Sequence, residues 1–330
     1  MARGALSCER GAALISAMMI VSVMAVVAMG VLDALRLSVR LSLNLEDREQ
    51  ANLYALGAEE LAAARISDAW RIEQTRQPAL DAMMGEPFLF PITEGQIRGV
   101  ARDGANCLNV NSVVAADGEG GLQGDDAGRA RLARLLDLLG VPPGESEAIA
   151  ASIADWIDTD ARPGLGGAED SYYGSLPDPY RTGETFMADV SEIRQVRGVT
   201  PALADALAPF LCARPTDEPS VLNLNTLTLE QSPLLAAYLG EPYDTDRAAR
   251  IFAARPVGGW RDVSTVFGLS LLQEPPIATE DQALYGLSSS VYDVALEVDY
   301  RETRVTLTTS LAVADGGRVS TLSRRYGVLQ

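Results

Sequence analysis

The sequence lacks two residue types entirely, histidine and lysine, so all 27 basic residues are arginines. The absence of histidine excludes a Ser-His-Asp or Cys-His catalytic group and a histidine zinc site. The absence of lysine excludes a phosphate-binding P-loop and a lysine Schiff base. The three cysteines, Cys8, Cys107 and Cys212, form no CxxC pair, which excludes a thiolate zinc ribbon. Together these absences disfavour an ordinary enzyme and favour a structural, binding or membrane role.

Negative charge is concentrated in the middle of the chain. The 330 residues carry 45 acids and a formal net charge of −18, and residues 51–288 hold the whole excess. Nucleic-acid binding requires a basic face that neutralises phosphates, so we expect no nucleic-acid partner. An acidic block of this kind serves solubility, or attracts divalent cations and arginine-rich partners.

A long apolar run near the N-terminus is the most informative segment. Residues 12–32 contain no charge, and as a helix rising ~1.5 Å per residue they span the ~30 Å hydrocarbon core of a bilayer. A secretory signal peptide has a shorter run followed by a small-residue cleavage site, which Asp33–Arg36 does not offer. A lipoprotein signal at Cys8 fails because the apolar run follows the cysteine. An uncut anchor, with Arg3 and Arg10 on the cytoplasmic side, fits the pattern.

Several patches, in order along the chain, carry a family resemblance. They read RGAALISAMMIVSVMAVVAM, LGAEELAAARI, CLNVNSV, ADWIDTDARPGLGGAEDSYY, DVSEIRQVRGV and VLNLNTL, from residue 10 to beyond residue 220. Together they resemble the minor pseudopilin K family of type II secretion. The resemblance implies that residues 1–11 are a prepilin leader, which prepilin peptidase cuts between Gly11 and Ala12. The apolar helix is then kept as a single-pass anchor in the bacterial inner membrane, with the rest of the chain in the periplasm.

The resemblance also implies a role in assembly, without catalysis. The protein is expected at the tip of the pseudopilus that supports export across the outer membrane, with minor pseudopilins I, J and H and the major pseudopilin as partners. Pilin-like proteins usually have glutamate at the fifth mature position, where it pairs with the N-terminal amine of a neighbouring subunit. Here that position is Ser16, and a subunit without the carboxylate can begin an assembly. The alternative is that Ser16 is simply a small residue tolerated in a lone anchor.

The expected fold class is α+β, in which a long N-terminal helix packs on a small antiparallel, pilin-like sheet with a large inserted α-helical domain. The resemblance implies one helix over 12–66, with 12–32 in the membrane, although residues 35–45 alternate as in a strand. Period-two alternation predicts strands over 95–102 and after residue 290, whereas the proline-rich stretch beyond Trp70 predicts loops. The expected boundaries are leader 1–11, helix 12–66, first part of the body 67–111, inserted domain 112–288 and C-terminal strands 289–330.

The middle of the chain contains an internal repeat. Cys107–Val113 (CLNVNSV) echoes Val221–Leu227 (VLNLNTL), and each is followed by helical runs and an Asp-Val-Ser turn. This predicts two related helical units. The pattern also resembles tandem helix-hairpin-helix modules, so the alternative function is a membrane-anchored periplasmic binding protein with such repeats. The hairpin that binds phosphate in those modules is replaced here by Leu239–Pro242, which disfavours DNA.

An acidic, glycine-rich stretch over residues 155–170 is the candidate site. Carboxylates that converge on one turn repel one another unless a cation neutralises them, and Ca²⁺ accepts six to eight oxygens in flexible geometry. The spacing does not match an EF-hand, and by itself it leaves open a helix end followed by a solvated loop. In the family resembled, this acidic stretch binds calcium. We therefore expect the Ca²⁺ ligands to be Asp158, Asp160, Glu169 and Asp170, and more weakly Asp189.

The cysteine count is consistent with an exported body. A cut after Gly11 removes Cys8 and leaves Cys107 and Cys212, which the oxidising periplasm allows to form a disulfide. Such a bridge would tie the strand before the inserted domain to the end of the first helical unit. The alternative is two buried thiols.

Overall fold

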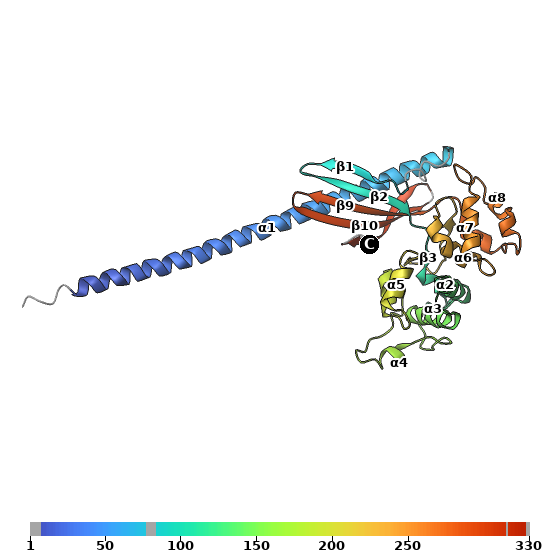
Figure 1. Cartoon of the computed structure of the whole chain (residues 1–330), viewed down its shortest axis with the longest axis horizontal. Coiled ribbons are helices and arrows are strands. Elements are labelled where there is room, and N and C mark those ends of the chain that lie inside the picture. The colour runs from blue at the N-terminus through green and yellow to red at the C-terminus, as the bar shows by residue number, and fades with distance from the viewer. Residues whose placement is uncertain (1–7, 77–83, 315, 328–330) are drawn as a thin grey trace, which may run out of the picture.

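The computed structural model describes residues 8–76, 84–314 and 316–327, with side chains from residue 13 to 71 and from residue 84 onward. The predicted leader therefore lies largely outside the described residues, and so do the side chains of Gly11 and Ala12. Figure 1 shows a long helix, α1, that runs from a free end onto a sheet. A separate group of short helices lies beyond the opposite end of that sheet.

Helix α1 (Cys8–Arg76) has 69 residues and is therefore ~100 Å long. Its N-terminal half is apolar and exposed, and an 18-residue window within it has a mean hydropathy of 2.5, enough to cross a membrane by length and composition. The helix passes through residues 35–45, where the alternating pattern favoured a strand, because backbone groups without a neighbouring strand are satisfied within a helix. It also continues beyond the expected end at residue 66, because Ala69 and Trp70 pack against the sheet.

The sheet has five antiparallel strands in the order β1 (Phe88–Ile92), β2 (Gly95–Asp103), β9 (Val291–Tyr300), β10 (Thr303–Ala314) and β11 (Arg318–Tyr326). The C-terminal part of α1 packs on one face, mainly over β9 and β10. Alternate residues of β9, including Val294, Leu296 and Val298, are fully buried beneath Ala51 and Ala55 of the helix. We call α1 from residue 47 onward, together with this sheet, the body.

The sheet differs from expectation at three points. Strand β1 lies in a stretch expected to be loop, because Pro91 is tolerated on an edge strand. The turn between β9 and β10 is at Arg301 and Glu302, which carry no glycine or asparagine signal; the Arg301 N–H donates to the Glu94 carbonyl. Residues 104–111, which the expected boundaries assign to the first part of the body, do not extend the sheet, since the chain leaves it after Asp103.

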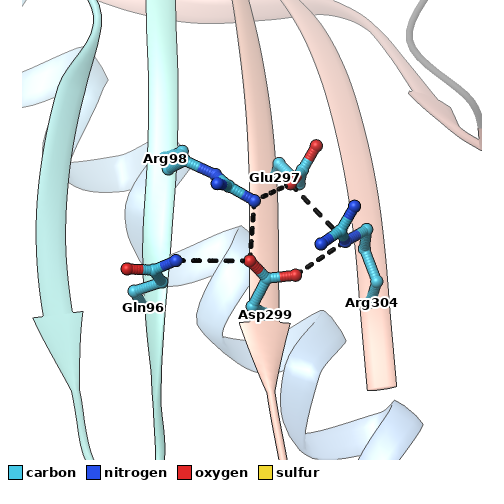
Figure 2. Close-up of polar contacts among 5 residues, drawn as sticks. All are labelled: Gln96, Arg98, Glu297, Asp299 and Arg304. Carbon is cyan, nitrogen blue, oxygen red and sulfur yellow. Dashed lines mark hydrogen bonds and ion pairs between the residues drawn. The ribbon is translucent and has the colours of Figure 1, made fainter. Parts of the chain in front are cut away.

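The outer face of the sheet, opposite α1, carries a charged network. Figure 2 shows Arg98 of β2 and Arg304 of β10 on either side of Glu297 and Asp299 of β9. The Arg98 and Arg304 guanidiniums each lie 2.7 Å from an Asp299 carboxylate oxygen, and Arg98 also bonds Glu297. Two arginines neutralise two carboxylates, so this half of the face is suited to remain in contact with water.

Helix α1 is also joined to the edge strand β11 by a buried carboxylate. The Glu59 side chain is 2% exposed and accepts two hydrogen bonds of 2.8 Å from the Arg324 guanidinium, as well as one of 2.7 Å from the Thr321 hydroxyl. Burial alone would raise the pKa of Glu59. The hydrogen bonds from Arg324 and Thr321 and the charge of Arg324 outweigh burial and hold that pKa below its usual range.

We expect Glu59→Gln to lower the free energy of unfolding of the body by about 2 kcal/mol, because charge-assisted hydrogen bonds are lost. Since the folded-state pKa is below the unfolded value of about 4.3, the ion pair stabilises at neutral pH and its contribution is lost as the pH falls below that value. Denaturant unfolding in detergent at pH 7 and pH 3 measures both effects. The exposed Glu49→Gln is the control; an equal loss at both pH values would contradict the ion pair.

The chain between β2 and β9, residues 104–290, is called the helical part. Its buried residues form one hydrophobic core of their own, from Leu108 to Tyr285. Its elements are β3 (Leu108–Asn109), η2 (Val110–Val113), β4 (Val114–Ala116), β5 (Leu122–Gly124), α2 (Asp126–Leu138), α3 (Pro143–Ile157), α4 (Asp170–Tyr173), η3 (Val190–Gln195), α5 (Pro201–Leu207), β6 (Leu211–Cys212), β7 (Leu222–Asn223), η4 (Leu229–Gln231), α6 (Ser232–Leu239), α7 (Thr245–Ala253), α8 (Val263–Phe267), η5 (Ser270–Leu272), η6 (Asp281–Leu284) and β8 (Tyr285–Gly286).

The two repeated Leu-Asn-x-Asn motifs make matching contacts. The second asparagine of each motif bonds both main-chain groups of a single residue: Asn111 bonds those of Met187, and Asn225 bonds those of Trp260. Both bonded residues lie two positions before an Asp-Val-Ser turn. Each motif also forms a short parallel pair, β3 with β6 and β7 with β8.

Candidate metal centre

Helix α3 brings the first carboxylates to the candidate site. The helix is closely packed, with Ile153 and Ile157 fully buried, and it ends at Asp158, whose N–H donates to the Ala154 carbonyl. Asp155, one turn earlier, accepts a hydrogen bond of 3.0 Å from the Gly164 N–H and so fixes the start of the glycine loop. Gly167 passes so close that a Cβ there would lie 2.0 Å from the Asp155 carboxylate, which explains why this position requires glycine.

The insert, residues 158–186, is held against α3 at its other end. The Trp156 carbonyl accepts hydrogen bonds from the main-chain N–H groups of Gly183 and Glu184 at 3.0 and 3.1 Å. The Trp156 ring lies edge-on to Tyr173 and Tyr180, with ring centroids 5.3 and 6.1 Å apart. These contacts bring Glu169 back to the end of α3.

The structure brings three of the predicted ligands together. Oxygen atoms of Asp158, Asp160 and Glu169 all lie within 4.8 Å of one another. Asp160 is exposed, whereas Asp158 and Glu169 are 5% and 4% exposed. Asp158 Oδ1 and Glu169 Oε1 are buried and have no hydrogen-bond partner among the described residues. Buried carboxylate oxygens without a donor are costly, so their chemistry fits a cation at this point.

The electrostatics of the cluster point the same way. Burial, followed by the negative charges of Glu169 and Asp155, raises the pKa of Asp158 to about 7. Burial, followed by the charge of Asp155, raises the pKa of Glu169 to about 7. Without a cation these groups are therefore partly protonated at neutral pH, and a divalent ion between them would favour the ionised forms.

The side chains of the other two predicted ligands, Asp170 and Asp189, contact other groups instead of the cluster. The Asp170 carboxylate accepts hydrogen bonds of 2.9 and 3.0 Å from the N–H and hydroxyl of Thr182, which hold its pKa below the usual range. Asp189 caps the short helix η3 by accepting from the Ser191 N–H at 2.9 Å, and it lies 2.8 Å from Arg325 of β11. Neither side chain belongs to the cluster of three.

The two remaining cysteines are joined in the structure. A disulfide links Cys107, just before β3, to Cys212 of β6. Strands β3 and β6 pair in parallel. The Ser220 hydroxyl lies 3.8 and 3.7 Å from the two sulfurs. The bridge therefore closes the stretch that contains the insert.

Comparison with known proteins identifies related chains over almost the whole length. Family models for type II secretion system protein K match residues 106–216 and 222–288. Type II secretion system protein K of Pectobacterium carotovorum subsp. carotovorum is 32% identical over 97% of both chains, and that of Aeromonas hydrophila is 31% identical over 97% of this chain and 98% of its own.

A solved structure has the same fold. It is the crystal structure of the GspK–GspI–GspJ complex from the type 2 secretion system of enterotoxigenic Escherichia coli. The matched chain is 25% identical, with a TM-score of 0.74, and the match covers 87% of this chain and 99% of that one. The chain described here therefore belongs to the type II secretion system protein K family.

Proposed function

We propose that this protein is the minor pseudopilin at the tip of the type II secretion pseudopilus, and that it supports export by assembly rather than by catalysis. The observation that carries the proposal is the position of the helical part. It lies beside the end of the body that is farthest from the free half of α1 (Figure 1). Subunits that stack along a thin fibre through their helices would clash with a group of 187 residues, 104–290, at each level. A subunit of this shape fits at an end.

The exposed N-terminal half of α1 supports the proposal that this helix is anchored in the inner membrane, with the body in the periplasm. Residues 14–45 expose large apolar side chains on all sides, which a bilayer and neighbouring helices would cover. Prepilin peptidase would cut between Gly11 and Ala12. Ser16 then stands at the fifth position and offers no carboxylate to the amine of a subunit above it.

The partners follow from the family. The matched chain was solved in a complex with GspI and GspJ, so we propose pseudopilins I and J as direct partners of this chain. Pseudopilin H and the major pseudopilin would lie below them in the same fibre. The body would serve as the pilin-like part of the subunit, and the contact pattern of Asn111 and Asn225 supports two related units in the helical part.

We also propose that Asp158, Asp160 and Glu169 hold a calcium ion. The cluster offers carboxylate oxygens, and the glycine loop beside it offers main-chain carbonyls to complete the six to eight ligands. The ion would neutralise the cluster and fix the insert on α3. In the second Leu-Asn-x-Asn unit the corresponding stretch, residues 254–259, is short and needs no such support.

The tip position is tested on isolated pseudopili. Glu147, an exposed residue of α3, is changed to cysteine in a Cys8→Ser background and coupled to gold through biotin. We expect label at a single end of each fibre, and a recovered protein that begins at Ala12. A label on the major pseudopilin serves as the control for even decoration. Gold along the fibre length would contradict the tip position.

A further inference from the structure

The body and the helical part do not share a hydrophobic core. Buried apolar residues of the body, such as Leu296 and Leu307, form one cluster with α1. Those of the helical part, such as Leu135 and Ile153, form another, and none of the buried residues that the structure describes belongs to both clusters. Parts of a chain that share only a small polar contact move relative to one another by default.

The chain crosses between the two parts twice, at adjacent points that we call the neck, residues 103–105 and 289–291. The Gly104 N–H donates to the Val291 carbonyl at 2.9 Å. The Asp103 carboxylate accepts from the Ala105 N–H at 2.8 Å, the Asn223 amide at 3.0 Å, and the hydroxyls of Thr226 and Ser289. The neck is thus held by hydrogen bonds around the Asp103 carboxylate and at Gly104, whose carbonyl also accepts from the buried Arg214 guanidinium of the helical part.

A cleft of about 1030 Å³ separates the two parts next to the neck. One wall is the outer face of the sheet, where the register places Val100, Ala295, Thr308 and Arg325 side by side on four strands. The other wall is the helical part around α5 and β6, including Pro209 and Leu211. Because the walls are separated by this space, the helical part has room to turn about the neck.

One ion pair joins the two parts outside the neck among the described residues. The Arg325 guanidinium of β11 lies 2.8 Å from the Asp189 carboxylate, with the side chains 59% and 36% exposed. Asp189 is held in place by the capping box of η3, in which Glu192 accepts from the Asp189 N–H. An exposed pair of this kind contributes about 0–1 kcal/mol and weakens with salt, so it can open and close readily.

We propose that the helical part is a hinged unit that turns about the neck. The Asp189–Arg325 ion pair is the latch that holds this unit against the outer face of the sheet. This inference goes beyond the proposed tip position and does not depend on it. A subunit with such a latch has two arrangements, one with the ion pair formed, as in this structure, and one with the ion pair broken and the helical part turned about the neck.

The test measures the distance between the two parts in the full chain in detergent. Spin labels are placed on Glu147→Cys in α3 and Ser320→Cys in β11, in a Cys8→Ser background that keeps the disulfide. Arg325→Gln removes the positive partner. Asp189→Asn removes the negative partner but keeps the capping hydrogen bond, since asparagine caps helices as well as aspartate does. Arg318→Gln, an exposed arginine on the same strand, is the matched control.

We expect one narrow distance distribution for the starting protein and for Arg318→Gln at low salt. Arg325→Gln and Asp189→Asn should each add a population at a different distance, and the double variant should add no more than either. About 1 M salt should produce the same population in the starting protein but change Arg325→Gln little. Unchanged distributions in both latch variants would overturn the proposal, and so would a broad distribution in the starting protein at low salt.

Discussion

Replacing the two buried carboxylates, Asp158→Asn together with Glu169→Gln, is expected to weaken calcium binding by about 100-fold or more, since even outer contacts of a metal site contribute 10–100-fold. The variant keeps the size of both side chains and removes both charges. Calorimetric titration of the chelator-treated protein measures the affinity. Calcium at about 100 times its Kd should stabilise the starting protein by about 2.7 kcal/mol and the variant by almost nothing.

The behaviour without calcium separates a metal site from a purely structural role. Burial raises the pKa of both Asp158 and Glu169 to about 7, so asparagine and glutamine resemble the protonated forms and remove mutual repulsion. In excess chelator the variant should therefore unfold at the same temperature as the starting protein or higher. Asp178→Asn, an exposed acid of the same insert, is the control. Equal calcium content in all three proteins would refute the site.

Removal of the disulfide by Cys107→Ser with Cys212→Ser is expected to lower the stability of the helical part by about 4–5 kcal/mol. The two cysteines are 105 residues apart, so the bridge greatly restricts the unfolded chain. A loss of this size corresponds to a drop in Tm of about 10 °C or more. Thermal unfolding followed by circular dichroism, with and without reductant, measures it.

In the uncut chain, produced without prepilin peptidase, Cys8→Ser is the matched control for this change, because Cys8 takes no part in the bridge. Reductant should lower the Tm of the starting protein and of Cys8→Ser, but it should leave the double serine variant unchanged. Because the body has its own core, its unfolding transition should stay where it was. A double variant that melts within 2 °C of the starting protein would contradict the predicted contribution of the bridge.

The sheet shows where local sequence patterns suffice and where they fail. Strand β9 alternates buried and half-buried residues along its whole length, so period two predicts it directly. The β9–β10 turn has no such signal, since Arg301 adopts a φ of 50° that is supported by Glu94 and Asp47, far away in the sequence. Residues 35–45 alternate as in a strand, yet they lie in a helix. No described strand lies beside them to accept their backbone hydrogen bonds, which are therefore made within the helix.

The sequence allowed the residue types of the candidate site to be predicted, but not which of the predicted ligands lie together. Asp158, Asp160 and Glu169 could be named from the acidic pattern taken with the family resemblance, because a helix end and a glycine loop bring such residues together. The contacts of Asp170 with Thr182, and of Asp189 with Arg325, depend on how the insert folds back and on the distant strand β11. Spacing along the chain contains no information on either contact.

The neighbouring positions of the two neck segments have a consequence for how such a chain could arise. Asp103 and Tyr292 are direct partners in the β2–β9 ladder, so both ends of the helical part meet at one rung of the sheet. A tight reverse turn could replace residues 104–290 and leave every strand in register. The helical part is therefore a single insertion between two paired strands, and its removal would leave a hairpin subunit in which β2 and β9 keep the same pairing.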